Sequence, residues 1–164
     1  MIHAHFYFAL ASFRLLLVAV DEPTRQADHR TNCTGPVNAV TFSSSPGTYL
    51  LTGSSDRSVH LSRALPSSTK SPGVAPTTTA PIQKYDAHGY SVLDLAVAAD
   101  NARFVSVGGD KQVFLWDVET GTTIRRWSGH TGRVEAVEFG GETDSVVVSG
   151  GCSPLGRNRH YEGS

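Results

Sequence analysis

The sequence is poor in charge and in cysteine. Charged residues make up 18% of its 164 residues, and the formal net charge of −1 does not support non-specific nucleic-acid binding through a basic surface. Only two cysteines are present, Cys33 and Cys152, which excludes a disulfide scaffold and leaves no C-x-x-C pair for zinc or redox chemistry. We therefore expect a reducing compartment, no cofactor, no metal and no direct nucleic-acid partner.

An uninterrupted apolar run of membrane-spanning length is also missing. The nearest candidate, Phe6–Val20, is interrupted by Arg14 and is shorter than the roughly 20 residues that a span requires. No lysine or arginine precedes it, and Val18-Ala19-Val20 is a poor cleavage site for a signal peptide. We interpret residues 1–33 as an extension followed by a linker, and expect no membrane. The alternative is a secreted or membrane-tethered β-domain that uses this run, with Asn32 then a glycosylation site.

What the sequence does contain is an internal repeat. Each of three segments begins with apolar residues at matched spacing, passes a polar turn, and enters a β-branched or aromatic run that ends in a hydroxyl residue. The matched valines Val92 and Val134 lie 42 residues apart, within the period of roughly 40 to 45 residues of a four-stranded propeller blade. No segment has a sustained helical period, so we expect helix at most in the amino-terminal run. The three segments are Gly35–Ser62, Gly89–Trp116 and Gly132–Gly151.

The repeat predicts an all-β fold of about two and a half propeller blades, near residues 34–88, 89–130 and 131–153. Val92–Trp127 is expected to form one four-stranded antiparallel meander. Residues 66–81, rich in Pro, Ser and Thr, are expected to form a flexible surface insertion in the first blade. The turns of the meander are predicted near Ala99–Arg103, Gly108–Lys111 and Glu119–Thr122.

The polar tail 154–164 is expected to continue no strand, which would leave the third unit without its last two strands. The apolar segment Val146–Val148 would then have no outer neighbours. A closed propeller needs at least four blades, so we expect the chain as given to be a truncated form of a longer protein. Open sheet edges recruit other strands, and self-association is the expected consequence.

The second unit carries four residues in the order and spacing that resemble a WD-repeat blade, and it closes with Trp116-Asp117. The resemblance implies that these four side chains form one buried hydrogen-bonded relay. In such a relay each polar group satisfies its neighbour, where an unpaired one would cost about 1 to 3 kcal/mol. The four residues are His88 before the first strand, Ser106 on the second, Asp110 in the turn and Trp116 on the third.

The first unit departs from this pattern at two of the four positions. It keeps Thr52 as the hydroxyl and Asp56 as the turn aspartate. Cys33 stands where the histidine belongs, and Ser62 stands where the tryptophan belongs. We therefore expect the first blade to be less stable than the second.

The third unit repeats the histidine as His130 and the hydroxyl as Ser149, but has Ser153 where the aspartate belongs. Ser, His and Asp also make up hydrolase catalytic sets, so a hydrolase that uses Ser106 or Ser149 is an alternative. A nucleophile needs an exposed cleft with an oxyanion site, whereas repetition at the blade period indicates local scaffold. We therefore treat these residues as structural and expect no enzymatic activity.

Further motifs resemble those WD-repeat proteins that organise mitogen-activated protein kinase cascades. The motifs are Gly35–Val40, His88–Asp94 and Gly108–Val113. The resemblance covers about residues 34–153 and implies a non-catalytic propeller scaffold for protein-protein interaction. It also implies kinase-cascade or spliceosome components as partners, in cytoplasm and nucleus. Ser71, which precedes a proline in the insertion, is a candidate phosphorylation site on this basis.

Overall fold

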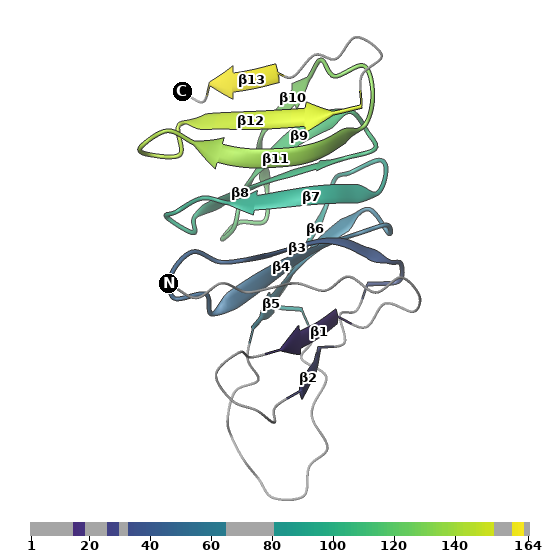
Figure 1. Cartoon of the computed structure of the whole chain (residues 1–164), viewed down its shortest axis with the longest axis vertical. Helices are drawn as coiled ribbons and strands as arrows, with labels where there is room; N and C mark the ends of the chain where they lie inside the picture. The colour runs from purple at the N-terminus through teal and green to yellow at the C-terminus, as the bar shows by residue number, and fades with distance from the viewer. Residues whose placement is uncertain (1–14, 19–25, 30–32, 65–80, 153–158, 163–164) are drawn as a thin grey trace, which may run out of the picture.

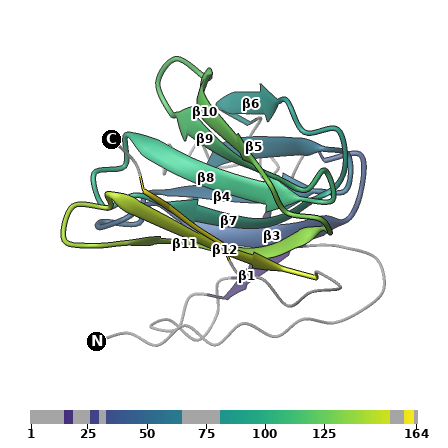
Figure 2. The ribbon, with the colours of Figure 1, turned by 90° about the horizontal axis from the view of Figure 1, so that it is seen from above.

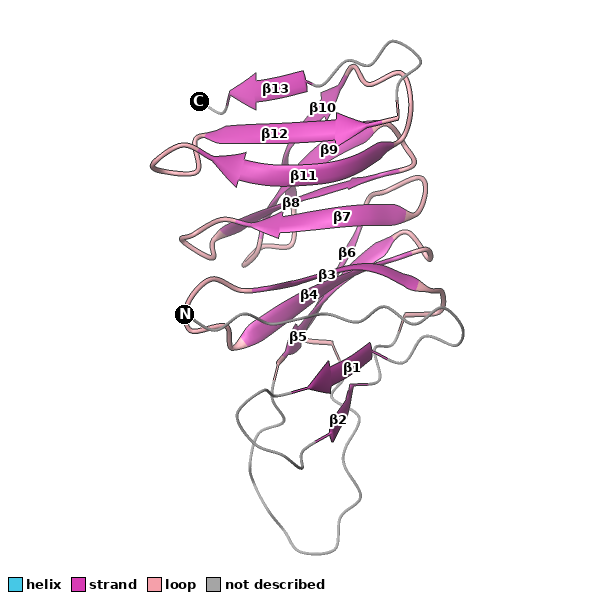
Figure 3. Ribbon diagram, in the orientation of Figure 1, coloured by secondary structure: helices cyan, strands magenta, loops and turns pink. Residues whose placement is uncertain are grey.

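The computed structural model describes residues 15–18, 26–29, 33–64, 81–152 and 159–162. This part of the chain contains thirteen strands and no helix, which confirms the all-β prediction. Three antiparallel sheets are stacked along the long axis of the molecule, as Figure 1 and Figure 3 show. Within the same ranges, no helical segment has the length and apolar character that crossing a bilayer requires.

Consecutive strands pair with one another in every sheet, as the repeat predicts. The first sheet contains β3 (Val37–Phe42), β4 (Tyr49–Ser54), β5 (Ser58–Arg63) and β6 (Gln83–Asp86). The second contains β7 (Val92–Val97), β8 (Arg103–Gly108), β9 (Gln112–Asp117) and β10 (Thr123–Ser128). The third contains β11 (Val134–Gly140), β12 (Val146–Gly151) and β13 (Arg159–Glu162). A separate antiparallel hairpin is formed by β1 (Leu15–Val18) and β2 (Gln26–His29).

The first strands of the three sheets, β3, β7 and β11, lie side by side (Figure 2). Two apolar clusters hold the stack together. Tyr85 and Val92 belong to the cluster between the first and second sheets, and Val113 and Val134 belong to the cluster between the second and third. Strand β8 contributes to both clusters because its successive side chains point to opposite faces. The central strands β8 and β9 of the second sheet are therefore buried on both sides.

The predicted meander is confirmed. Strands β7 to β10 cover Val92–Ser128 in antiparallel order. The connections between them fall at residues 98–102, 109–111 and 118–122, which coincide with the three predicted turns. The second unit therefore has the strand order and the turn positions that its sequence predicts.

Each sheet has the same irregularity in its first strand, where the register shifts by one residue. Opposite the start of this shift, the second and third sheets have Gly108 and Gly151. A Cβ atom at Gly108 would collide with the carbonyl oxygen of Ser91, and one at Gly151 would collide with that of Arg133. Glycine is therefore required at both positions by the close approach of the neighbouring backbone.

Two expectations about the tail are wrong. Strand β13 pairs with β12 along the whole of Val146–Ser149, so the tail does continue a strand. Val146–Val148 accordingly has neighbours on both sides, and the third sheet has three described strands. The reason is that the open edge of β12 offers backbone donors and acceptors, which pair with another backbone whatever its side chains are. In the amino-terminal run, Leu15–Val18 is a strand rather than a helix.

Several predictions fall on residues outside the described ranges. These are the possible glycosylation site Asn32, the candidate phosphorylation site Ser71, the replaced aspartate position Ser153 and all but one residue of the insertion 66–81. They stay predictions.

Candidate functional site

A chain of hydrogen bonds joins the four relay residues of the second sheet. The Oγ atom of Ser106 lies 2.6 Å from Nε2 of His88 and accepts a 2.8 Å hydrogen bond from the indole Nε1 of Trp116. At the other end, Nδ1 of His88 lies 2.7 Å from Oδ2 of Asp110. The loop before β7, strand β8, the β8–β9 turn and strand β9 each contribute one residue. The relay thus ties strands β8 and β9 and the turn between them to the loop that precedes β7.

The carboxylate of Asp110 organises the outer end of this relay. It accepts hydrogen bonds from the backbone amides of Gly89 at 3.3 Å and Gln112 at 3.4 Å, in addition to the contact with His88. Burial raises the pKa of Asp110, but the hydrogen bond and charge of His88 and the two amides outweigh it, so the pKa lies below its ordinary value. An ionised carboxylate only accepts, so Nδ1 of His88 is the donor.

Because the relay is buried, a substrate does not reach it. Ser106 has no exposed surface, and the side chain of His88 is fully buried. The hydroxyl of Ser106 is already engaged on two sides, by His88 and by Trp116. A serine nucleophile has to meet a substrate beside oxyanion donors, which this geometry does not allow. The hydrogen bonds instead fix the strands relative to one another.

The third sheet contains the inner part of the same relay. Nε2 of His130 lies 2.9 Å from the Oγ atom of Ser149, and both residues are buried. This contact joins the loop before β11 to strand β12, as His88 and Ser106 join the corresponding elements of the second sheet. Ser149 is therefore as inaccessible as Ser106.

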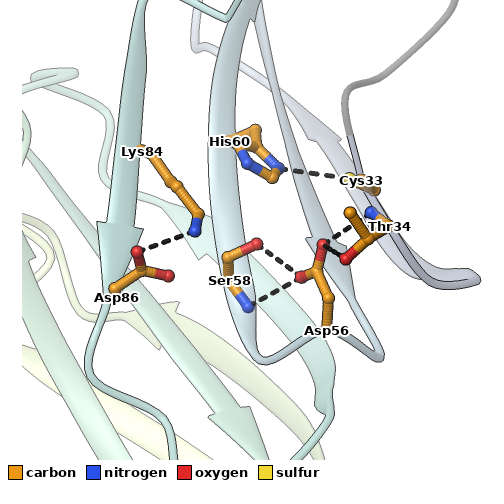
Figure 4. Close-up of polar contacts among 7 residues, drawn as sticks. All are labelled: Cys33, Thr34, Asp56, Ser58, His60, Lys84 and Asp86. Atoms are coloured by element: carbon orange, nitrogen blue, oxygen red, sulfur yellow. Dashed lines mark hydrogen bonds and ion pairs between the residues drawn. The ribbon is translucent and has the colours of Figure 1, made fainter.

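In the first sheet the structure places the expected relay residues in two separate clusters. The Sγ atom of Cys33 lies 4.0 Å from Oγ1 of Thr52. It also lies 3.1 Å from Nδ1 of His60, a contact that Figure 4 shows. His60 is buried on β5, directly opposite Thr52 in the strand register. Cys33 thus takes the place of the histidine next to the hydroxyl, while a histidine from a different strand contacts the cysteine. Ser62, at the tryptophan position, is buried and belongs to neither cluster.

Asp56 forms the second cluster, with Thr34 and Ser58 (Figure 4). Its Oδ2 atom accepts the amide of Thr34 at 2.9 Å and the hydroxyl of Thr34 at 3.3 Å. Its Oδ1 atom accepts the amide of Ser58 at 3.0 Å and the hydroxyl of Ser58 at 2.5 Å. Burial raises the pKa of Asp56, but these hydrogen bonds outweigh it and hold the pKa below its ordinary value.

The electrostatics around His60 favour its neutral form. Burial lowers the pKa of His60 below its ordinary value, and the charge of Lys84 lowers it further, against the opposing effects of Asp56 and Asp86. Lys84 and Asp86 form an exposed ion pair of 2.8 Å on β6, the strand next to β5 (Figure 4). The hydrogen bond to Asp86 raises the pKa of Lys84. A neutral imidazole with its proton on Nε2 accepts a hydrogen bond at Nδ1 from the thiol of Cys33.

Sequence reasoning missed His60, Thr34 and Ser58 as members of the first-sheet site. The alternation of β5 did carry a signal, because Ser58 and His60 fall on one face of a strand that starts two residues after Asp56. It missed Tyr85 as well, which packs edge-on against Phe104 of the second sheet with ring centroids 4.8 Å apart. Burial raises the pKa of Tyr85 to about 12. Among the described residues, no group of three or more His, Cys, Asp or Glu side chains is placed to hold a metal ion.

Comparison with known families agrees with the arrangement of the strands. The family model for the WD domain, G-beta repeat, matches residues 25–61 and 79–117. The first match contains β2, β3, β4 and most of β5, and the second contains β6 to β9. The sequence repeat is therefore offset by one strand from the sheet, because the second match includes the last strand of the first sheet.

The chain is also similar to longer proteins. Over 124 residues the chain is 31% identical to the WD repeat domain-containing protein 83 homolog of Dictyostelium discoideum, covering 75% of this chain and 33% of that protein. Over 118 residues it is 31% identical to the DDB1- and CUL4-associated factor 5 of Homo sapiens, covering 70% of this chain and 11% of that protein. The chain thus spans about a third or less of the length of these relatives. Its repeat matches and stacked four-stranded meanders show that it is a WD-repeat protein with the all-β architecture of a partial propeller.

Proposed function

We propose that this chain is a non-catalytic scaffold that binds other proteins through its surface loops. WD-repeat proteins are in general interaction scaffolds without catalytic activity. The observation that carries the proposal is the burial of those side chains in the second and third sheets that could act in catalysis. His88, Ser106, His130 and Ser149 are all buried, and their hydrogen bonds join the loop before the first strand of each sheet to its second strand. Recognition then falls to exposed loop residues.

The second-sheet loops offer one such surface. Tyr90, in the loop before β7, is 66% exposed and lies against Gly109 of the β8–β9 turn. Lys111, in the same turn, is also exposed. Tyrosine is a common anchor in protein interfaces, because its large and rigid side chain buries a large area at low conformational cost.

The partners that we propose are components of a kinase cascade or of the spliceosome, in cytoplasm and nucleus. The support is the resemblance of residues 34–153 to kinase-cascade organizers of the family, together with the similarity to the WD repeat domain-containing protein 83 homolog. We do not favour a secreted or membrane-tethered domain, because both family matches are to the repeat and the secretion argument rests on Phe6–Val20 alone.

The test is affinity purification of the tagged full chain from cells, followed by cross-linking and mass spectrometry. The loop variant combines Tyr90→Ser with Lys111→Glu, and the matched control is Ile124→Ser on β10, where Ile124 is 50% exposed. We expect kinase-cascade or spliceosome proteins with the native chain and the control, and their loss with the loop variant. Recovery of no such protein would overturn the proposed partners, and equal recovery by the loop variant would overturn the proposed surface.

A further inference from the structure

The thiol–imidazole contact between Cys33 and His60 is replaced in the second sheet by the packing of two rings, whose centroids lie 4.3 Å apart. There, His88 occupies the place of Cys33, and Phe114, which pairs with Ser106 as His60 pairs with Thr52, occupies the place of His60. The scaffold therefore does not require a thiol and an imidazole at these two positions. We propose that Cys33 is a nucleophilic thiol, activated by His60, which hydrogen peroxide oxidises to a sulfenic acid.

The geometry gives the thiol a proton acceptor. Nδ1 of His60 lies 3.1 Å from Sγ of Cys33, within the distance for a hydrogen bond to sulfur. The charged groups around the imidazole are Asp56, Lys84 and Asp86, and with burial their combined effect leaves His60 neutral at neutral pH. A neutral imidazole beside a cysteine is the arrangement that activates cysteine nucleophiles, because the thiolate rather than the thiol attacks.

The cysteine is held in place without being closed off. The next residue, Thr34, is fastened to Asp56 through both its amide and its hydroxyl, which fixes the backbone beside Cys33. Cys33 itself is partly exposed, whereas His88 at the corresponding place is buried. A small oxidant can therefore reach the sulfur while the imidazole behind it stays shielded by the sheet.

The oxidation balances with hydrogen peroxide as the only co-reactant. The thiol proton passes to Nδ1 of His60, and a sulfur lone pair forms a bond to one peroxide oxygen as the O–O bond breaks. The departing hydroxide takes the proton from His60 and leaves as water. The sulfur loses two electrons, the peroxide gains them, and Cys33 ends as a sulfenic acid.

The experiment measures the two cysteines of the full chain against each other. The chain is treated with a limiting amount of hydrogen peroxide, the sulfenic acid is trapped with dimedone, and the peptides are quantified by mass spectrometry. Cys152 is the internal reference, because it is the more exposed of the two free thiols. We expect Cys33 to be labelled about tenfold faster than Cys152. Faster labelling of Cys152, which exposure alone predicts, would overturn the proposal.

The variant His60→Phe tests the role of the imidazole, since phenylalanine occupies that place in the second sheet. We expect it to bring the rate at Cys33 down to that at Cys152 or below, and an unchanged rate would overturn the role of His60. A second measurement needs no variant. The rate of alkylation by iodoacetamide is followed from about pH 8 to about pH 6.5, and we expect the ratio of Cys33 to Cys152 to rise as the pH falls. A ratio that stays constant would show that no base assists Cys33.

Discussion

The carboxylate of Asp94 on β7 accepts a 2.8 Å hydrogen bond from the backbone amide of Val137 on β11. β11 is at the end of its sheet, so one of its edges has no strand partner there. A side chain of the second sheet therefore satisfies a donor at the open edge of the third. Asn38 on β3 makes a corresponding contact with β7, donating to the carbonyl oxygen of Val92 at 2.8 Å. Polar contacts thus join neighbouring sheets in addition to apolar packing.

The variant Asp94→Ala should loosen the third sheet. The amide of Val137 would lose its acceptor, and we expect a cost of about 1 kcal/mol. Hydrogen exchange measured by NMR should show faster exchange at Val137 and at its neighbours on β11. The exposed Glu142→Gln serves as control for a lost negative charge. Unchanged protection at Val137 in the Asp94 variant would contradict this prediction.

The variant Asp110→Ala should destabilise the chain more than Asp56→Ala. Removing Asp110 leaves the buried His88 without its acceptor, at a cost of about 1 to 3 kcal/mol. Asp56 also holds several donors, but those of Thr34 are exposed and can bond to water instead. Urea denaturation of both variants compares the two costs. Equal losses would show that the complete relay contributes no more than the interrupted one.

The stabilisation by Asp110 should disappear in acid. Its pKa in the folded chain lies below the ordinary value, so as the pH falls the unfolded chain binds the proton first. The contribution is fully present above the unfolded-state pKa of about 3.9 and is lost as the pH falls through the folded-state value. The difference in unfolding free energy between the native chain and Asp110→Asn should therefore shrink on acidification. A difference that is independent of pH would argue against an ionised Asp110.

The variant Gly108→Ala should be much more harmful than Gly89→Ala. A methyl group at Gly108 would collide with the backbone of Ser91, whereas one at Gly89 would meet nothing within contact distance. Displacing the backbone should cost about 1 to 3 kcal/mol at Gly108 and little at Gly89. Thermal melting of the two variants provides the comparison. Similar melting temperatures would mean that β7 and β8 can move apart without cost.

The second sheet could be predicted from the sequence because its local signals agree with one another. Val92–Trp127 contains runs rich in β-branched and aromatic residues, has turn residues between them, and repeats at the blade period. The relay residues are expected from the resemblance of this unit to a WD-repeat blade, and the structure places His88 and Asp110 within hydrogen-bond distance. When local preferences agree with the overall fold, the structure of a segment can be predicted from its sequence.

The last strand of the third sheet and the site in the first sheet could not be predicted, because they depend on contacts between backbones or between distant segments of the chain. β13 has the polar sequence Arg159–Glu162, and its pairing rests on the backbone edge of β12 rather than on an apolar pattern. The contact between Cys33 and His60 joins residues 27 positions apart, through the register of β4 and β5. A repeat alignment compares Cys33 with His88, but it does not show which side chain faces the cysteine.

The one-strand offset between the sequence repeat and the sheet has a consequence for how such a chain can grow. A duplicated repeat brings one strand to the sheet before it and three strands to a new sheet, as the match over residues 79–117 does with β6 and with β7 to β9. Every added copy therefore contributes a strand to the sheet of the repeat before it. The gene can therefore gain or lose whole repeats while each internal sheet keeps four strands. The number of units can vary without any change in the contacts between neighbouring sheets.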